Sequence, residues 1–171
     1  LEQQLGGFRS NLAELDATPH AARPTGLSEL DRFLGKGLVP GAALLLGGEP
    51  GIGKSTFLLQ LCGLLAAQGE RVLYVTGEES LPQLKSRAER LDVLSPTLLT
   101  MASNSADEAM AAMRAEKPVL VVIDSVQTLA SSLADGLPGS VSQVRAVSAQ
   151  LVEEARKCGA ALTLVGHMTK E

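Results

Sequence analysis

One short stretch of this sequence has the residue types and the spacing needed to hold a nucleoside triphosphate. Residues 48–55 read G-E-P-G-I-G-K-S and match the phosphate-binding loop pattern G-x-x-x-x-G-K-[ST] at every fixed position. Glycines let the backbone bend so that N–H groups point inward, and the N-terminus of a following helix adds to this anion site. The nucleotide-binding residues that we predict here are Gly48, Glu49, Pro50, Gly51, Ile52, Gly53, Lys54, Ser55 and Thr56.

Three side chains of this loop have separate predicted tasks. Lys54 is expected to reach the β- and γ-phosphates as a compact cation and so to take part in catalysis. The Ser55 hydroxyl would complete the coordination of a Mg²⁺ ion that keeps several waters, while Thr56 would touch the α-phosphate. The flanks fit, because an apolar run at 42–46 precedes the loop and helical apolar spacing follows it from 57 to 69. The alternative is a glycine-rich turn that matches the motif by chance, which would not require a strand before it and a helix after it.

A carboxylate follows the most apolar run of the chain. Asp124 comes directly after residues 119–123, which read V-L-V-V-I and are typical of a strand buried on both faces of a parallel sheet. We predict that Asp124 forms the second half of the magnesium site by accepting a metal-bound water, and it is part of the predicted nucleotide site. The alternative is that Asp124 caps a turn after the strand.

Two neighbouring acids, Glu78 and Glu79, follow the predicted strand at 71–76. Either carboxylate would be placed to position and polarise the water that attacks the γ-phosphate. The alternative is that both acids belong to the first turn of the next helix, where the helix dipole favours negative charge. The residues themselves do not separate these two interpretations, nor do they say which glutamate would act.

His167 ends the last predicted strand, close to Thr169 and Lys170. A polar residue at this position would sense the γ-phosphate and transmit its loss to the following segment. The alternative is a structural histidine whose ring is satisfied by its neighbours.

The pattern of elements predicts an α/β fold. Predicted strands lie at 42–46, 71–76, 98–101, 119–123 and 160–165, and predicted helices at 28–34, 57–69, 80–91, 105–117 and 140–157. Serines 28, 80, 105 and 140 are predicted helix caps, and those at 80 and 105 have capping-box spacing. This alternation predicts a mostly parallel central sheet with helices on both faces, and ligands bind such sheets at the carboxyl ends of the strands.

Composition limits the classes of protein and partner. The chain has 171 residues, a net charge of -4 and 45% hydrophobic residues, which is typical of one globular domain without an electrostatic footprint for nucleic acid. Aromatic residues make up 2% of the chain, so a base-stacking platform is not expected. Cys62 and Cys158 lack metal-ligand spacing and are expected to be buried thiols in helices. Without a candidate membrane span or signal peptide, we expect a cytoplasmic protein with no membrane partner.

Six blocks of sequence together resemble one family. They are residues 25–31 (TGLSELD), 48–55, 74–80 (YVTGEES), 122–128 (VIDSVQT), 138–145 (PGSVSQVR) and 165–171 (VGHMTKE). In this order they are similar to the bacterial RadA (Sms) family of DNA repair proteins, which are RecA-like ATPases. The resemblance runs from about Arg23 to the last residue.

The resemblance implies a RecA-like P-loop NTPase that uses ATP and Mg²⁺ and assembles as a hexameric ring. Members of the family drive branch migration of recombination intermediates on single-stranded DNA, so it implies a DNA-dependent, helicase-like ATP hydrolase. It also implies that Asp124 is the magnesium-site aspartate, that Glu78 or Glu79 is the catalytic glutamate and that His167 is a sensor. Ring ATPases borrow a cation from a neighbouring subunit, and Lys170 is one candidate.

The same family usually carries three parts that this sequence lacks: a four-cysteine zinc finger, a Lys-Asn-Arg-Phe-Gly motif and a domain similar to the Lon protease. We therefore expect the chain to be a piece of a longer protein. Residues 1–22 would be a lead-in and linker, and residues 23–171 a truncated RecA-like ATPase domain without zinc. Binding to single-stranded DNA is expected in the full-length protein and only weakly in this piece.

Two other functions would use the same loop. A RecA-fold signalling ATPase similar to the clock protein KaiC shares paired glutamates after the second strand, and would use ATP to time or phosphorylate a protein partner. A small-molecule kinase on a P-loop fold is the other, although the sequence has no recognisable acceptor-binding lid.

Overall fold

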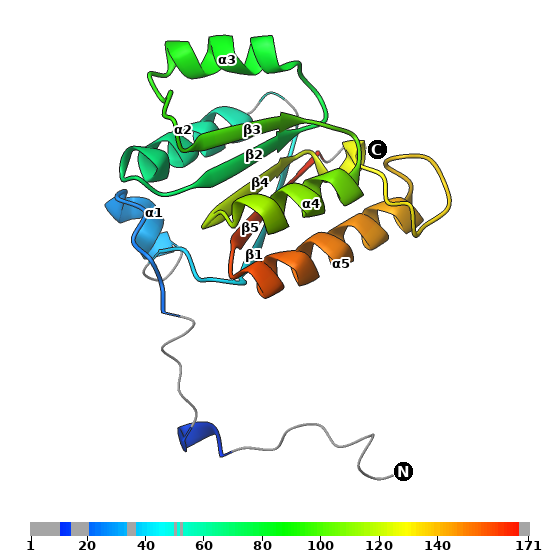
Figure 1. The fold of residues 1–171 in the computed structure, drawn as a ribbon, viewed down its shortest axis with the longest axis horizontal. Coiled ribbons are helices and arrows are strands. Elements are labelled where there is room, and N and C mark those ends of the chain that lie inside the picture. The colour runs from blue at the N-terminus through cyan, green and yellow to red at the C-terminus, as the bar shows by residue number, and fades with distance from the viewer. Residues whose placement is uncertain (1–10, 15–20, 34–36, 50, 52, 168–171) are drawn as a thin grey trace.

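The centre of the molecule is a five-stranded sheet in which all neighbouring strands are parallel (Figure 1). The computed structural model describes residues 11–14, 21–33, 37–49, 51 and 53–167. In spatial order the strands are β1 (Ala43–Gly48), β5 (Ala161–His167), β4 (Leu120–Asp124), β2 (Val72–Thr76) and β3 (Leu98–Ala102). Non-consecutive neighbours in this order mean that the chain crosses over the sheet through helices, as parallel pairing requires.

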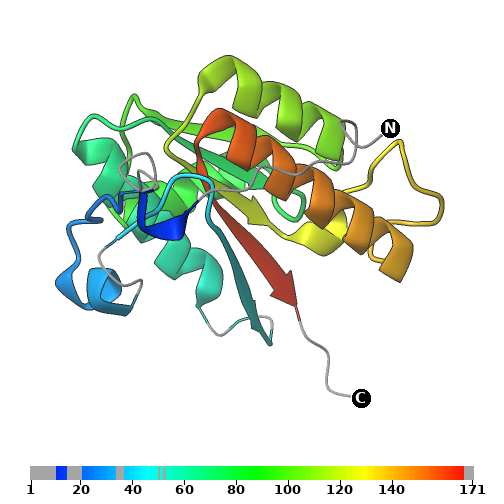
Figure 2. The same cartoon turned by 90° about the horizontal axis from the view of Figure 1, so that it is seen from below.

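Helices cover both faces of the sheet, as Figures 1 and 2 show. One face is covered by α2 (Lys54–Ala67) and α3 (Leu81–Arg90), and the other by α4 (Ala106–Glu116) and α5 (Val141–Cys158). A shorter helix, α1 (Ser28–Phe33), precedes β1. The predicted α/β class, with a parallel sheet and helices on both faces, is confirmed.

The inner strands are buried because their alternate side chains enter two different cores. In β2, Leu73 and Val75 pack with α4 and α5, while Val72 and Tyr74 pack with α2 and α3. Every residue of β2 and β4 is buried, which explains why the apolar run around β4 shows no alternation in the sequence. Burying one large aliphatic side chain contributes about 1.5–3 kcal/mol, so these two cores hold the layers together.

The strand before the phosphate loop differs from the inner strands because it lies at an edge of the sheet. Its predicted span, 42–46, is shifted: β1 starts at Ala43 and runs to Gly48, the first residue of the loop motif. Exposed and half-buried residues alternate along it, and Leu45 is 68% exposed. The loop therefore begins at the last strand residue without an intervening turn.

The helix caps that we predicted are found in three different states. Ser80 forms a full capping box with Gln83, and Ser140 caps α5, which ends at Gly159 in a left-handed conformation. At α4 only half of the predicted box forms. The Ser105 hydroxyl accepts from the Glu108 N–H as expected. The Glu108 carboxylate, however, accepts from the Ser103 hydroxyl, and the Ser105 N–H donates to that same hydroxyl.

The predicted cap of α1 is wrong. Ser28 lies inside the helix, and the Leu27 carbonyl accepts from the Asp31 N–H at 2.9 Å as the first helical bond. The start of α1 is held by Thr25, whose hydroxyl and N–H both donate to the Asp31 carboxylate. The Thr25 hydroxyl lowers the pKa of Asp31. Thr25 and Asp31 together therefore stabilise the start of α1, the role that we predicted for Ser28.

Both cysteines lie in helices as predicted, and both are free thiols. Cys62 is fully buried in α2, whereas Cys158 at the end of α5 is only partly buried, so our expectation of two buried thiols is half right. Burial raises the pKa of both thiols, and the carboxylate of Glu154 adds to the effect at Cys158. None of the helices in the described ranges is both long and apolar enough to cross a membrane.

The close approach of α2 to Val93 gives a test of the packing. A methyl group on Gly63 would lie 2.4 Å from Val93 Cβ and 3.2 Å from its Cα, so side chain and backbone would both have to move. Because backbone as well as side chain must move, the cost lies in the upper part of the range for overpacking, about 2–3 kcal/mol, and the gain of about 1 kcal/mol in helix propensity offsets part of it. We therefore expect Gly63→Ala to lower the free energy of unfolding by about 1–2 kcal/mol in urea titrations.

The exposed position Gln60 on the same helix provides the control for this test. Gln60→Ala is expected to change the free energy of unfolding by less than about 0.5 kcal/mol. If Gly63→Ala were neutral or stabilising, α2 would not be held against Val93 as closely as the structure indicates.

Candidate nucleotide-binding site

The parallel register brings the predicted site residues to one edge of the sheet. Thr76 of β2 pairs with Asp124 of β4, Asp124 pairs with Val165 of β5, and Gly48 of β1 pairs with His167. A pocket of about 430 Å³ opens at this edge. It is lined by Gly51, Gly53, Lys54, Ser55, Thr56, Glu78, Glu79, Arg87, Asp124, Val165 and His167. Residues from four loops and helices thus face a single cavity at the carboxyl ends of the strands.

The phosphate loop turns directly into helix α2. Gly53 is the N-cap of α2 and has a φ of 93°, a left-handed conformation that glycine adopts without strain. The N-terminus of α2 lies at the pocket, as an anion site at a helix end requires. The predicted ligand-binding residues Pro50 and Ile52 fall outside the described residues.

Lys54 is buried between the loop and the sheet and is 8% exposed. Its Nζ atom donates to the carbonyls of Gly48 at 2.6 Å and Glu49 at 3.1 Å, both in the loop. It also donates to the Gly166 carbonyl of β5 at 3.4 Å. The ammonium group therefore joins the loop to the neighbouring strand, at the wall of the pocket.

Three side chains form a buried hydrogen-bonded group beneath the loop. The Asp124 Oδ2 atom accepts from the Tyr74 hydroxyl at 2.7 Å and from the Ser55 hydroxyl at 2.9 Å. Asp124 is 4% exposed, and burial, with the nearby Asp124 charge, raises the pKa of Tyr74. Tyr74 therefore stays protonated and donates to the carboxylate. Within the described part of the chain, the Asp124 carboxylate accepts from these two hydroxyls and not from the backbone of the following turn, so the capping alternative lacks its bonds.

The other carboxylate oxygen of Asp124 gives a test of whether a magnesium ion fits here. The Oδ1 atom is buried and has no hydrogen-bond partner in the described part of the protein. Magnesium binds oxygen ligands and keeps several of its waters, which need acceptors. A serine hydroxyl beside a buried carboxylate with a free oxygen has that chemistry, so Ser55 and Asp124 fit the ion.

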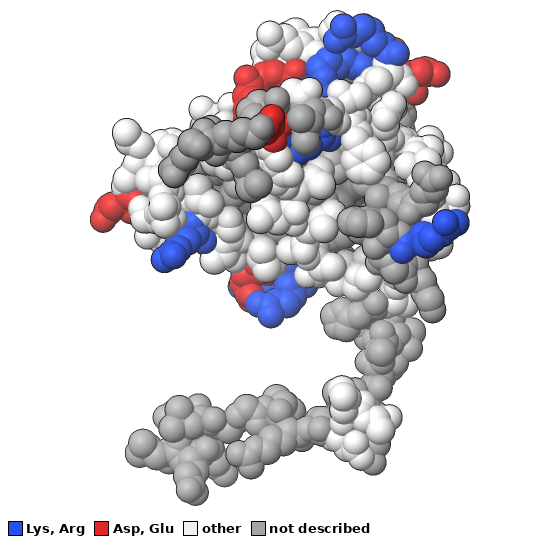
Figure 3. All heavy atoms as spheres, turned by 180° about the vertical axis from the view of Figure 1, so that it is seen from behind, with Lys and Arg blue, Asp and Glu red and all other residues white. Residues whose placement is uncertain are grey.

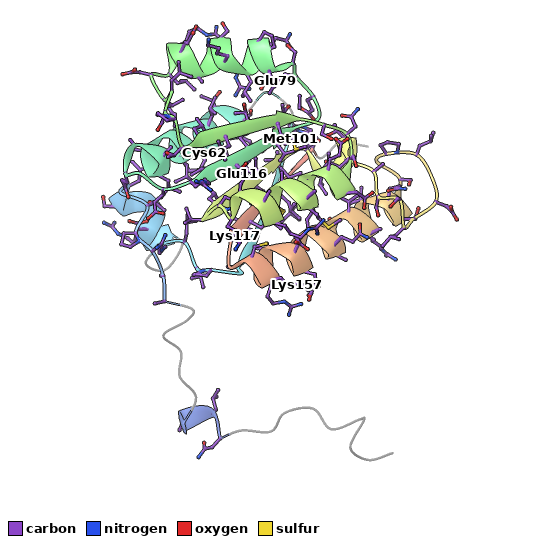
Figure 4. The ribbon with its side chains drawn as sticks, viewed as in Figure 1. Cys62, Glu79, Met101, Glu116, Lys117 and Lys157 are labelled. Atoms are coloured by element: carbon purple, nitrogen blue, oxygen red, sulfur yellow. The ribbon has the colours of Figure 1, made fainter. Side chains whose placement is uncertain are left out.

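The two predicted glutamates have different partners. Glu78 Oε1 accepts from the Ser125 hydroxyl at 2.8 Å and lies 2.7 Å from His167 Nε2. Glu79 forms an ion pair with Arg87, beside the start of α3 as Figure 4 shows. Both precede Ser80, the N-cap of α3, and the first turn of that helix contains no acid. The interpretation of the pair as first-turn acids is therefore wrong.

Arg87 and Tyr74 are site residues that the sequence did not reveal. Arg87 lies on α3, and its Nη2 atom donates to the Ser55 hydroxyl at 2.8 Å while Nη1 donates to Glu79. The position of Arg87 in the sequence does not distinguish it from the other charged residues of α3. Tyr74 carried a weak signal, because a hydroxyl in an otherwise aliphatic buried strand needs a partner.

His167 is fixed through its backbone by the side chain of Gln127. The Gln127 amide donates to the His167 carbonyl at 3.1 Å and accepts from its N–H at 3.4 Å. Neither ring nitrogen has an aligned hydrogen bond, although Nε2 lies within ion-pair distance of Glu78. The backbone of His167 is thus held, and its ring has one ion-pair contact in place of an aligned hydrogen bond, so the sensor and the structural interpretations both stay predictions. Thr169 and Lys170 fall outside the described residues.

Comparison with known proteins agrees with this geometry. The sequence profile of the AAA domain family (AAA_25) matches residues 10–171. The chain is 48% identical to the DNA repair protein RadA of Pseudomonas aeruginosa over 161 residues, which is 94% of this chain and 35% of that protein. It is 47% identical to RadA of Escherichia coli over 148 residues and 44% identical to RadA of Brucella abortus over 152 residues. Each of these two alignments covers 86% of this chain and 32% of the relative.

These findings confirm the resemblance to RadA proteins and the RecA-like P-loop class of the fold. They do not favour the KaiC-like alternative. The chain spans about a third of the length of the curated relatives that it matches.

The buried bond between Tyr74 and Asp124 makes a prediction about stability. Tyr74→Phe removes one of the two donors to a buried carboxylate, and a hydrogen bond to a charged group contributes about 1.5–3 kcal/mol. We expect a loss of that size in the free energy of unfolding, measured by urea denaturation at neutral pH. The control is the same change in an Asp124→Asn background, where the loss should shrink because the two residues interact directly. Equal losses in both backgrounds would contradict the assignment.

Proposed function

Because the chain belongs to the AAA domain family, we propose that it is the ATP-hydrolysing core of a RecA-like DNA repair motor. One observation carries the proposal: three separate segments, which contribute Lys54 with Ser55, Glu78 and Asp124, line one pocket at the carboxyl edge of the sheet. This arrangement contains a cation for phosphates, oxygen ligands for a metal and a carboxylate for water. The names of the RadA relatives supply the link to DNA repair.

In the proposed mechanism the loop N–H groups and the N-terminus of α2 bind the phosphates, and Lys54 shifts from loop carbonyls onto the β- and γ-phosphates. Ser55 would ligate Mg²⁺ directly, and Asp124 would hold one of its waters. When bound, the ion neutralises the charge that develops on the transferred phosphoryl group. His167, which lies beside Glu78, would report the γ-phosphate to the end of β5.

We further propose that Glu78, rather than Glu79, positions the attacking water. Glu79 is paired with Arg87, which compensates its charge and gives it a fixed partner. The Glu78 carboxylate lies in the pocket near Asp124 and is 35% exposed, so water has access to it. Arg87 then acts as a positioning residue that ties α3 to Ser55 and keeps Glu79 in place.

The motor part of the proposal concerns a longer protein. Single-stranded DNA and recombination intermediates would be the partners, branch migration the activity, a hexameric ring the assembly and the cytoplasm the location. On the face in Figure 3 acidic and basic side chains are interspersed, and the net charge is -4, so this piece would bind DNA weakly. Residues 1–22 would serve as a lead-in and linker to the ATPase domain at 23–171.

The proposed role of Lys54 is tested by ATP binding. Lys54→Ala removes a cation that would make charge-assisted bonds to the phosphates, each contributing about 1.5–3 kcal/mol. We expect ATP affinity, measured by titration with a fluorescent ATP analogue, to fall about 10- to 100-fold. Lys85→Ala, which changes an exposed lysine of α3, should leave ATP affinity unchanged.

The motor part of the proposal is tested by hydrolysis in the full-length protein, where single-stranded DNA should raise the rate. A rate that does not respond to DNA would contradict the motor function.

The choice between the two glutamates is tested by their amides. Glu78→Gln should lower kcat about 10²- to 10⁴-fold with ATP affinity retained, because a general base is lost but no phosphate contact is. Glu79→Gln should lower kcat less than about tenfold and reduce stability, since it leaves Arg87 without its carboxylate. Single-turnover hydrolysis of ATP by the full-length protein is the measurement. A larger effect for Glu79→Gln would reverse the assignment.

A further inference from the structure

We propose that Glu78, Asp124 and His167 form a binding site for a first-row transition-metal dication, such as Mn²⁺, that needs no nucleotide. The site shares Asp124 with the proposed magnesium site but differs from it in using an imidazole nitrogen and a second carboxylate as direct ligands. One ligand atom from each of the three residues lies within 4.8 Å of the others. Such a spacing allows all three to reach one ion.

The fold fixes these three ligands from adjacent strands. Asp124 ends β4 and His167 ends β5, while Glu78 follows β2 by two residues, and β4 lies between the other two strands. The three strand ends therefore converge without the need for a flexible loop. A metal that binds here would link the carboxyl ends of three neighbouring strands.

The ligand atoms lack the hydrogen bonds that buried polar atoms normally have. Asp124 Oδ1 and His167 Nδ1 are buried and have no hydrogen-bond partner among the described residues, while the buried His167 Nε2 has only an ion-pair contact of 2.7 Å with Glu78 Oε1, another member of the cluster. Asp124 is 4% exposed, and its Oδ2 atom is fully used by Tyr74 and Ser55, so Oδ1 is left to face the cluster. A buried polar atom without a partner costs about 1–3 kcal/mol, and a bound cation would satisfy the oxygen and one nitrogen together.

Neighbouring groups orient each ligand, as is typical of metal sites. The Ser125 hydroxyl donates to Glu78 Oε1 at 2.8 Å, and the Tyr74 hydroxyl donates to Asp124 Oδ2 at 2.7 Å. Gln127 holds the backbone of His167 through both its N–H and its carbonyl. The carboxylates and the imidazole are therefore preorganised, which lowers the entropic cost of binding an ion.

The charges of the pocket favour a dication of moderate affinity. Among the described lining residues, three carboxylates (Glu78, Glu79 and Asp124) face two cations (Lys54 and Arg87). The excess negative charge attracts a metal, while the two cations weaken its binding. An imidazole ligand favours Mn²⁺, Co²⁺ or Zn²⁺ over Mg²⁺, which prefers oxygen ligands and retains its waters.

The test is a titration of this chain with Mn²⁺ in the absence of nucleotide, followed by electron paramagnetic resonance. We expect saturable binding of a single ion, with nitrogen coupling to the bound ion from one imidazole. His167→Gln should abolish the coupling and weaken binding at least about tenfold, which corresponds to about 1.4 kcal/mol. His20→Gln, which changes the other histidine of the sequence, should alter neither. Glu78→Gln, at a partly exposed position, should also weaken binding without loss of fold.

Three results would overturn the inference. They are no saturable Mn²⁺ binding at millimolar concentration, binding and nitrogen coupling that persist in His167→Gln, or displacement by Mg²⁺ at equal concentration. Circular dichroism of each variant would verify that its fold is intact. The outcome can be told apart from that of the proposed ATPase, because Lys54→Ala should lower ATP affinity about 10- to 100-fold but leave Mn²⁺ binding intact or tighter, since it removes a cation from the same pocket.

Discussion

The buried carboxylate of Asp124 is the interaction on which the geometry of the site depends. It lies at the end of the central strand β4, where water does not compete for it, and two hydroxyls donate to the same oxygen. One hydroxyl belongs to Tyr74 of the neighbouring strand, and the other to Ser55 in the first turn of α2. The positions of β2 and β4 are thus coupled to that of the phosphate loop. Any shift of α2 would leave the buried Asp124 carboxylate with fewer hydrogen-bond donors, and an uncompensated buried charge is destabilising.

The parallel register is the second constraint, and it explains why residues far apart in sequence meet. The three pairings among these strands are all parallel, so the carboxyl ends of β1, β5, β4 and β2 form one edge. The segments that leave this edge contribute Lys54 at the start of α2 and Glu78 and Ser125 in loops, and His167 is the last residue of β5. A slip of one residue in any strand would move its ligand to the opposite face of the sheet.

The sequence predicted the parts of the structure that depend on local pattern and left out those that depend on long-range contact. The strand and helix that flank the loop motif, the buried run of β4 and the capping box at Ser80 depend on local pattern, and all three are found. Arg87 could not be found in this way, because only the packing of α3 over the sheet brings its guanidinium to Ser55. The half-formed box at Ser105 has a different, local reason, since Ser103 competes for the Glu108 carboxylate.

The places where the protein departs from ordinary packing rules are concentrated at the pocket. In the described part of the chain four buried side-chain atoms lack a hydrogen-bond partner, and three of them belong to Asp124 and His167. Each such atom costs about 1–3 kcal/mol, a large fraction of the 5–15 kcal/mol that typically stabilises a domain. The two cores beside the sheet contain no comparable departure among their described members. A cost that is concentrated at one edge, and is offset by well-packed layers elsewhere, is expected where polar atoms are kept free for a ligand rather than for the fold.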